Sequence, residues 1–198
     1  EFFSRGLIYT SRKGRGVINV NSYPMVKFFN LEQLGKELNM KKSYMVSKKY
    51  DGSGIYIFNG IVTTMGNFKS KEAGYAKEYL ERVEGLMSKL NNPELKYFNY
   101  TIFGEIVDPR INLPEKVEEA NFYITYAYDE NGNPLNVQEL GTELGLNHVN
   151  YVEMNASQLL EHINSLDEEV IKSGDRKMVK EGIVAWTVDP SSEDVVIF

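Results

Sequence analysis

Short runs in which apolar and polar residues alternate recur along the chain, and they are rich in β-branched and aromatic residues. This pattern predicts half-buried β-strands. The predicted strands are residues 6–10, 16–20, 43–47, 54–60, 61–65, 97–107, 121–128, 148–152, 182–188 and 194–198. Between two of them, Phe58-Asn59-Gly60-Ile61 predicts a tight hairpin turn, because Asn-Gly readily adopts positive φ angles. The Asp-Glu-Asn-Gly sequence at 129–132 predicts a second turn.

A second pattern, with apolar residues three or four positions apart, predicts amphipathic helices. The first helix has its apolar positions at Ala76, Leu80, Val83, Met87 and Leu90. Ser70 is its expected N-cap, and Glu72 lies in its first turn. The second helix has its apolar positions at Leu159, Leu160, Ile163, Leu166, Val170 and Ile171. Lys172 and Gly174 are expected to end it. A shorter helix is predicted from Leu31, Leu34 and Leu38.

Many strands joined by tight turns, with only a few helices, are typical of an α+β fold built on antiparallel sheets. The chain of 198 residues is long enough for one domain with a substantial core. No G-x-G-x-x-G follows a predicted strand, and G-x-x-x-x-G-K-[ST] does not occur. We therefore do not expect a doubly wound fold with a Rossmann or P-loop nucleotide site.

The composition narrows the class of protein. A net charge of −6 argues against a positive surface for nonspecific nucleic-acid binding, although it leaves room for a local basic groove. Basic residues cluster at 12–15, 41–42 and 48–49, and we interpret the first two clusters as solvated loop charges. There is no cysteine, which excludes disulfides and thiolate metal sites and fits an intracellular protein. No apolar run is long enough to cross a bilayer, and no signal peptide is recognisable.

The two ends of the sequence suggest a fragment. It begins at Glu1 without methionine and stops at Phe198 inside a predicted strand. We expect a domain that is truncated at both ends and lacks a C-terminal domain.

Charged residues stand at or inside predicted apolar strands, next to or near a glycine. These positions are Arg5, Lys49, Glu105 and Glu181, in the sequences RGLIYT, KYDGSG, TIFGEIV and EGIVAW. Each alone has an ordinary explanation, which is a charge at a strand end that reaches solvent. Lys49 in particular is also compatible with a surface lysine beside a turn. Four such positions, with glycines that permit close backbone approach, favour one shared pocket.

The order of these elements is K-x-D-G, then F-G-E, then E-G-I-V-A. It resembles motifs of the covalent nucleotidyltransferases, the superfamily of polynucleotide ligases and mRNA capping enzymes. P-x-x-K-F-F-N at 24–30 and GNFKSKEA at 66–73 are similar to segments of the phage-type RNA ligase 1 family. The resemblance extends from Arg5 to about Ala185, and K-F-F-N is more specific than K-x-D-G.

This resemblance implies the ligase adenylation-domain fold and an ATP-dependent RNA ligase that acts in RNA repair. Lys49 would attack the α-phosphate of ATP, giving lysyl-AMP. AMP would pass to the 5′-phosphate of an RNA end, and a 3′-hydroxyl end would then be joined with release of AMP. A lysine attacks only as the neutral amine, and nearby cations or bound Mg²⁺ favour that form. Lys48 is one such cation, Tyr50 would be a spacer, and Asp51 and Gly52 would set the turn that aims Lys49.

By the same resemblance, residues from distant parts of the chain bind the nucleotide. Arg5 would contact phosphate or the ribose side of AMP, and Lys27 the polyphosphate; both also add positive charge near the amine. Phe29 would form part of the pocket wall. Glu105 would accept a hydrogen bond from a ribose hydroxyl, and Glu181 would help to hold Mg²⁺.

The aromatic run at 121–128 supplies a candidate for the adenine face. We select Tyr126, with plain core packing as the alternative. The proposed chemistry needs no histidine, so we interpret His148 and His162 as structural.

Two departures from the family pattern bear on activity. The family usually has a basic residue after the first hairpin, whereas this chain has Met65, which offers no hydrogen-bond donor; Lys69 is a candidate substitute. The final K-x-K motif of the family is absent, since Lys177 and Lys180 precede Glu181 instead of following it. We expect that motif beyond the present C-terminus.

Two alternatives stay open. One is a DNA ligase or capping enzyme, although these normally carry an OB-fold domain for which no residues remain. The other is a catalytically silent nucleotide- or RNA-binding relative, which Met65 and the missing K-x-K favour. The intact Lys49, Glu105 and Glu181 favour the enzyme. The resemblance fits a cytoplasmic protein of phage or viral type and leaves the physiological RNA, the number of metal ions and the oligomeric state undetermined.

Overall fold

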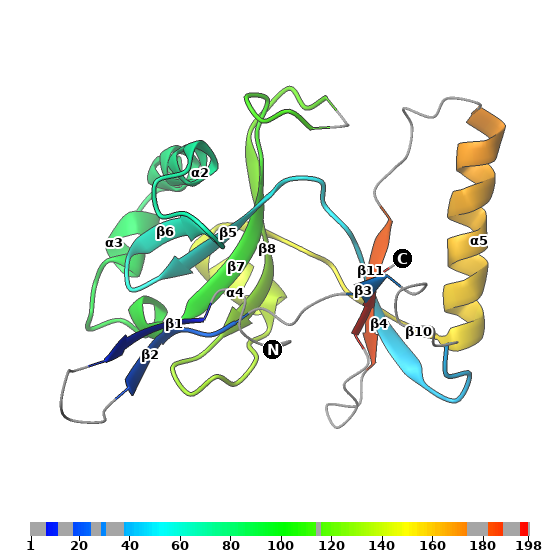
Figure 1. Ribbon diagram of the computed structural model, residues 1–198, viewed down its shortest axis with the longest axis horizontal. Helices are drawn as coiled ribbons and strands as arrows, with labels where there is room; N and C mark the ends of the chain where they lie inside the picture. Colours follow the sequence, from blue (N-terminus) through cyan, green and yellow to red (C-terminus); the bar gives the residue numbers. More distant parts are fainter. Residues whose placement is uncertain are drawn as a thin grey trace. The chain divides into compact units, whose positions relative to one another are not determined.

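A computed structural model describes residues 7–11, 18–24, 29–30, 38–113, 116–173, 182–187 and 195–197. The chain divides into two compact units (Figure 1). Unit 1 comprises Glu1–Val26 and Gly52–Val149, and unit 2 comprises Lys27–Asp51 and Asn150–Phe198. Each unit has a five-stranded sheet of its own.

The sheet of unit 1 has the strand order β6-β5-β7-β8-β9. Its strands are β5 (Ser53–Phe58), β6 (Ile61–Thr64), β7 (Thr101–Val107), β8 (Asn121–Tyr128) and β9 (Asn147–His148). All its pairs are antiparallel except β8 with β9. A separate antiparallel ribbon is formed by β1 (Ile8–Ser11) and β2 (Ile18–Ser22). The predicted antiparallel character of the fold is therefore confirmed, with parallel pairs at sheet edges.

The hairpin between β5 and β6 has the predicted turn. Asn59 has a φ of 47° and Gly60 a φ of 72°, the left-handed values that a two-residue turn requires. The second predicted turn is also present, since Asp129 O accepts a hydrogen bond from Gly132 N at 3.1 Å. Both turns close a chain reversal with residues that tolerate positive φ.

The helix α2 (Lys71–Arg82) begins where the sequence predicts. The Ser70 side chain accepts a hydrogen bond from the backbone N–H of Ala73, as an N-cap does. The prediction of one helix as far as Leu90 is wrong, because α2 ends at Arg82 and α3 (Leu86–Leu90) is a separate short helix. Between them Gly85 has a φ of 70°, which an uninterrupted α-helix does not accommodate.

Two further helical segments of unit 1 were not predicted. They are the 3₁₀ turn η1 (Lys96–Asn99) and the helix α4 (Val137–Leu144). Asn136 caps α4 through its side chain, and Gly145 ends it with a φ of 70°. Both signals stand in the sequence, and the helix was missed because it is only two turns long.

Unit 2 has the strand order β10-β4-β11-β12-β3. Its strands are β10 (Val152–Asn155), β4 (Ser43–Lys48), β11 (Ile183–Thr187), β12 (Val195–Ile197) and β3 (Phe29–Asn30). The helix α5 (Ala156–Ser173) includes Lys172, and Gly174, which is expected to end it, lies outside the described residues. The helix packs on β4 and β10, and Leu159 joins Tyr44 and Ala185 in the buried core. Of the third predicted helix, Leu31 and Leu34 lie outside the described residues.

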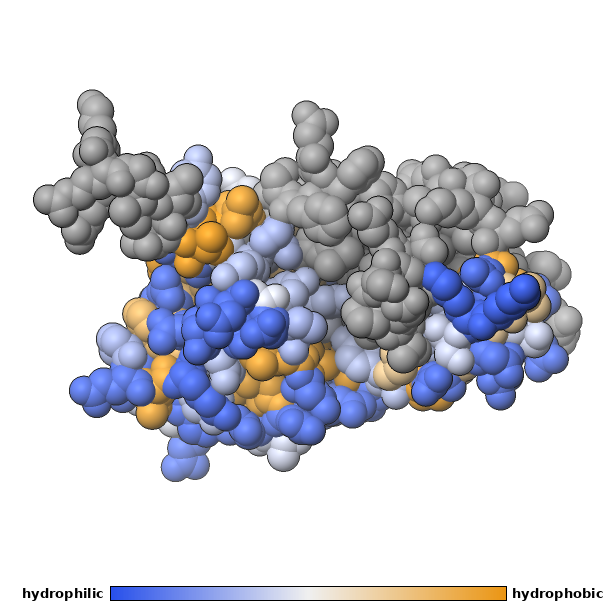
Figure 2. Space-filling view, turned by 90° about the horizontal axis from the view of Figure 1, so that it is seen from below, coloured by the Kyte–Doolittle hydropathy of each residue, from blue (hydrophilic) through white to orange (hydrophobic). Residues whose placement is uncertain are grey.

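Among the residues coloured in Figure 2, hydrophilic ones predominate, and apolar residues form separate patches. Within the described residues, no helix combines the length and the apolar character needed to span a membrane.

Candidate active site

Lys49 lies directly after the last residue of β4, in unit 2. Its backbone N–H donates a hydrogen bond to Gly182 O at 3.1 Å. This bond continues the antiparallel pairing of β4 with β11, in which Lys48 faces Ile183. The K-x-D-G element is therefore fixed beside the E-G-I-V-A element. Glu181 itself lies outside the described residues.

Lys48 is exposed, and its Nζ lies 5.3 Å from the centroid of the Tyr50 ring. That distance suits a cation–π contact. This contact pairs Lys48 with Tyr50. The role of Lys48 in nucleotide binding stays a prediction.

Glu105 lies in the middle of β7, in unit 1, where it faces Gly54 of β5 and Tyr123 of β8. It is half-buried in a strand whose other residues are all buried, and its Oε2 atom is inaccessible to solvent. A carboxylate in such a place is costly unless polar groups compensate it. Glu105 is therefore not a charge at a strand end, although as a half-buried residue it keeps part of its surface accessible to solvent.

Two glycines of β5 and the turn before it make room for that carboxylate. A Cβ atom at Gly52 would lie 2.7 Å from Ile106 O and 3.2 Å from Glu105 Oε2. At Gly54 it would lie 3.0 Å from Cζ of Phe103 and 3.6 Å from Glu105 Oε1. The glycine of K-x-D-G is thus required by close approach of the backbone to the F-G-E strand.

Gly104, the glycine of F-G-E, is also required by close packing. A Cβ atom at Gly104 would collide with the ring of Phe122 and lie 2.6 Å from Tyr123 O. Both motif glycines therefore let strands and turns of unit 1 come together around Glu105. Asp51, the last residue of unit 2 before Gly52, also has a buried carboxylate oxygen, Oδ2.

Tyr126 lies on the same face of the sheet as Glu105. It faces Phe103 across the β7–β8 pair, and Phe103 in turn faces Tyr56; paired residues share a face, as do alternate residues of one strand. Tyr126 packs against a buried cluster that includes both of these aromatic residues. Burial raises the pKa of Tyr126 well above its ordinary value, so its phenol stays protonated at neutral pH. The alternative of core packing is thus supported, and a contact with adenine stays a prediction.

Several predicted site residues lie outside the description. Arg5, Lys27 and Glu181 are not among the described residues, and of Phe29 only the backbone is described, paired with Val196. Among the described side chains no group of three or more His, Asp and Glu residues is arranged to hold a metal ion. The predicted metal ligand, Glu181, is outside that set.

A charged cluster after β7 was not predicted. Arg110 donates two hydrogen bonds from its guanidinium to the buried carboxylate of Asp108, at 2.8 and 2.7 Å. It also donates one to Glu78 of α2 at 2.7 Å and lies 3.9 Å from the ring centroid of Tyr75. The Arg110 guanidinium holds the pKa of Asp108 below its ordinary value. The sequence signal was Asp-Pro-Arg, which is typical of a turn after a strand.

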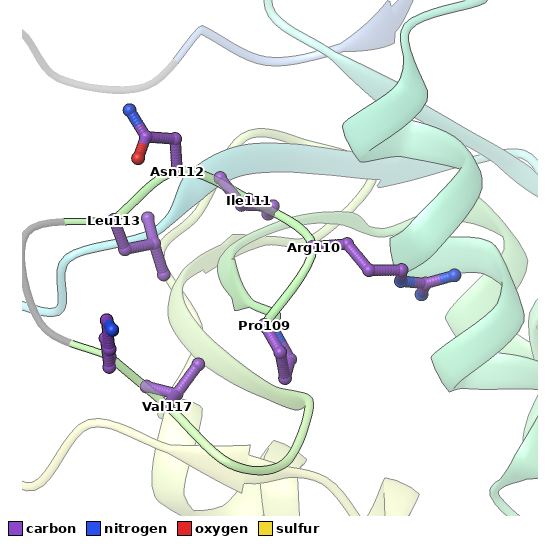
Figure 3. Close-up of a pocket in the computed structure, with 7 residues that line it drawn as sticks. Pro109, Arg110, Ile111, Asn112, Leu113 and Val117 are labelled. Atoms are coloured by element: carbon purple, nitrogen blue, oxygen red, sulfur yellow. The ribbon is translucent and has the colours of Figure 1, made fainter.

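Two surface hollows of unit 1 adjoin this cluster. One, of about 430 Å³, is lined by the loop that includes Pro109, Leu113 and Val117; Figure 3 shows Arg110 pointing away from that loop. The other, of about 590 Å³, lies between α2 and residues 118–120. Glu105 lines neither of them, so these hollows are not the predicted nucleotide pocket.

His148 contacts Gly141, and its Nδ1 lies 3.1 Å from Val149 O. His162 accepts a hydrogen bond at its backbone oxygen from the Ser165 side chain. None of these three contacts involves a predicted site residue.

No family model and no curated protein matches the chain. Comparison with solved structures does find similar chains. An archaeal ATP-dependent RNA ligase superposes over 98% of this chain with a TM-score of 0.62 and 14% identity. A variant of the Naegleria gruberi RNA ligase, solved with ATP and Mn, covers 100% with a TM-score of 0.57 and 18% identity. The chain has the fold of the ATP-dependent ligases.

The same fold is shared with a candidate ATP-dependent DNA ligase from Aquifex aeolicus, at a TM-score of 0.60 and 16% identity over 96% of the chain. The resemblance inferred from the motifs is thereby confirmed at the level of the fold, which RNA and DNA ligases share. The chain spans 58% of the length of each of these three structures.

Proposed function

We propose that this chain is the adenylation domain of an ATP-dependent RNA ligase. The neutral amine of Lys49 attacks the α-phosphorus of ATP, a P–N bond forms, the bond to the β-phosphate oxygen breaks, and pyrophosphate leaves while the nitrogen loses a proton. AMP is then transferred to the 5′-phosphate of an RNA end. Attack by a 3′-hydroxyl end on that activated phosphate joins the two ends and releases AMP.

The observation that carries this proposal is the packing of the K-x-D-G element on two other motif elements. Lys49 N donates a hydrogen bond to Gly182 O, and Gly52 packs so closely on β7 that an added Cβ atom would lie 2.7 Å from Ile106 O and 3.2 Å from Glu105 Oε2. Each contact lies within one unit. Within each unit, one motif element is thus a neighbour of part of the K-x-D-G element, and these two neighbourhoods support the proposal.

The remaining roles are the ones that the resemblance implies. Glu105 accepts a hydrogen bond from a ribose hydroxyl, Arg5 and Lys27 bind phosphate, and Tyr126 contacts the base. Glu181 is the candidate ligand for Mg²⁺. Mg²⁺ is often held by one or two carboxylates together with substrate phosphates, so the proposal does not require a cluster of three acids. When bound, the ion would neutralise phosphate charge.

The choice of RNA over DNA rests on the K-F-F-N element at 27–30, because the fold is common to both kinds of ligase. Joining nicked RNA and nicked DNA duplexes under the same conditions separates the two. Label transfer from ATP but not from GTP excludes a capping enzyme.

The decisive experiment is mass spectrometry of the full-length protein after incubation with ATP and Mg²⁺. We expect an adduct of one AMP that Lys49→Ala abolishes. Lys41→Ala is the matched control, since Lys41 is an exposed lysine of the same unit, and it should retain the adduct. An unmodified wild-type protein that still binds ATP or RNA would instead favour the catalytically silent relative, the reading that Met65 supports.

A further inference from the structure

The loop that joins β6 to α2 exposes two large apolar side chains. Phe68 is 57% exposed and Met65 is 40% exposed. One exposed apolar residue is ordinary in a soluble protein. Two in the same short loop, one of them aromatic, call for a partner.

Hydrogen bonds hold the backbone of this loop in place. The hydroxyls of Thr63 and Thr64 donate to Asn67 O at 3.1 and 3.0 Å. Asn67 Oδ1 accepts from Lys69 N at 2.8 Å, and Ser70 caps the helix that follows. The aromatic side chain therefore projects from an ordered loop, and binding through it has a low entropic cost.

The loop also lies at the end of a stretch of sequence that has no acidic residue and carries exposed cations. Lys69 and Lys71 are both exposed. From Gly52 to Lys71 the sequence contains no aspartate or glutamate, whereas the whole chain has a net charge of −6. The first acid beyond it is Glu72, in the first turn of α2. This combination of an aromatic ring and cations suits a polyanion that carries stacking groups.

The loop leaves the sheet near Glu105. β6 pairs antiparallel with β5, and its last residue, Thr64, faces Ile55. Glu105 faces Gly54, the neighbour of Ile55, on the other side of β5. The exposed loop thus begins at the end of the sheet that carries Glu105, all within unit 1.

We propose that Met65 and Phe68, flanked by Lys69 and Lys71, form a platform on which a base of single-stranded RNA stacks. Aromatic side chains stack on bases without sequence preference, and neighbouring cations bind the phosphates. Met65 stands where the resemblance leads us to expect a positively charged residue, and it serves here as an apolar contact to a nucleobase. This inference rests on the proposed function, because it assigns a part of the RNA substrate to the edge of the adenylation site.

The test measures binding of a fluorescein-labelled, unstructured RNA of roughly 12 nucleotides, a length within the span of single-strand sites. Phe68→Ala should raise Kd by about 5-fold or more, and Phe68→Trp should bind as tightly as the wild type or tighter. Ile61→Ala is the matched control: Ile61 is 41% exposed at the opposite end of β6, and its removal should leave Kd unchanged. Lys69→Gln should reduce the slope of log K against log salt by about 0.7.

AMP-adduct formation, measured on the same variants, separates this inference from the proposed function. An adduct retained in Phe68→Ala together with weaker RNA binding supports the platform. Equal RNA binding by wild type, Phe68→Ala and Phe68→Trp overturns it and leaves the enzyme proposal intact. RNA binding that depends on Phe68 without any adduct supports the platform and overturns the enzyme proposal. Self-association that Phe68→Ala abolishes, seen by sedimentation, would make the patch a contact between copies and also overturn the platform.

Discussion

Replacing Gly52 with alanine tests how Gly52 packs against β7 within unit 1. The new methyl carbon would lie 2.7 Å from Ile106 O and 3.2 Å from Glu105 Oε2. Cβ atoms essentially never come within 3.0 Å of another heavy atom. Ile106 belongs to β7, where it faces Ser53, so its carbonyl cannot rotate away cheaply. The start of β5 must shift from β7 by several tenths of an ångström.

The size of the effect follows from that clash. Overpacking of this kind costs about 1–3 kcal/mol. A domain of this size loses roughly 2–4 °C in Tm for each kcal/mol, so we expect Tm to fall by about 2–12 °C. Asp51 directly precedes Gly52 and Lys49 lies three residues before it, and a misplacement of about 1 Å can slow a reaction roughly 100-fold. We therefore expect AMP-adduct formation to slow by about 10-fold to 100-fold.

Both quantities are measured on one preparation: Tm by circular dichroism, and the rate of adduct formation from α-³²P-labelled ATP. Gly74→Ala is the matched control, because nothing lies within 4 Å of the added carbon and Gly74 is in α2. It should stabilise the protein by about 0.5–1 kcal/mol and leave the rate unchanged. A Gly52→Ala protein that melts and reacts like the wild type would refute the argument. A lower Tm with an unchanged rate in folded protein would restrict Gly52 to packing.

Three further predictions concern stability, each measured by urea unfolding. The Arg110 guanidinium lowers the pKa of Asp108. The ionised carboxylate therefore stabilises the fold above the unfolded-state pKa of about 4, and this stabilisation is lost as pH falls through the lowered folded-state pKa. Asp108→Asn should destabilise the protein at pH 7 and flatten the acid side of the curve of unfolding free energy against pH, and an unchanged acid side would contradict this. Gly60 has a φ of 72° beside Asn91, so Gly60→Ala should cost about 1–2 kcal/mol, whereas Gly66→Ala, with nothing nearby, should not. Ser70→Ala should cost about 1 kcal/mol through loss of the α2 cap, and Ser70→Asp should retain it; equal stability of the two variants would exclude capping.

Local signals predicted much of the fold. Asn59-Gly60 specified the hairpin, Ser70 the start of α2, and the apolar spacing of 159–171 the helix α5. These features are determined by neighbours in sequence, which is why one sequence suffices. The break at Gly85 was missed because Met87 and Leu90 continue the apolar spacing of α2, and spacing alone does not report a left-handed residue.

Contacts between residues far apart in the sequence were harder to predict. The close approach of Gly52 to Ile106 and Glu105 depends on the pairing of β5 with β7, and no local pattern reports which strands pair. The same holds for the bond from Arg110 to Glu78 of α2. The motifs identified Glu105 only through a resemblance, since composition and periodicity cannot separate an acid within a strand from one at its end.

The motif glycines, Gly52 and Gly104, and the motif lysine, Lys49, differ in how far packing accounts for them. Gly52 and Gly104 are required by packing, because a methyl group at either would collide with the backbone or a ring. A catalytically silent relative with this fold would need them equally, so they do not favour an enzyme. Lys49 is different: its contact with Gly182 uses the backbone N–H, which every residue except proline supplies. The β4–β11 pairing therefore does not require a lysine at this position, and Lys49→Ala removes the amine that we propose as the nucleophile while keeping this backbone bond.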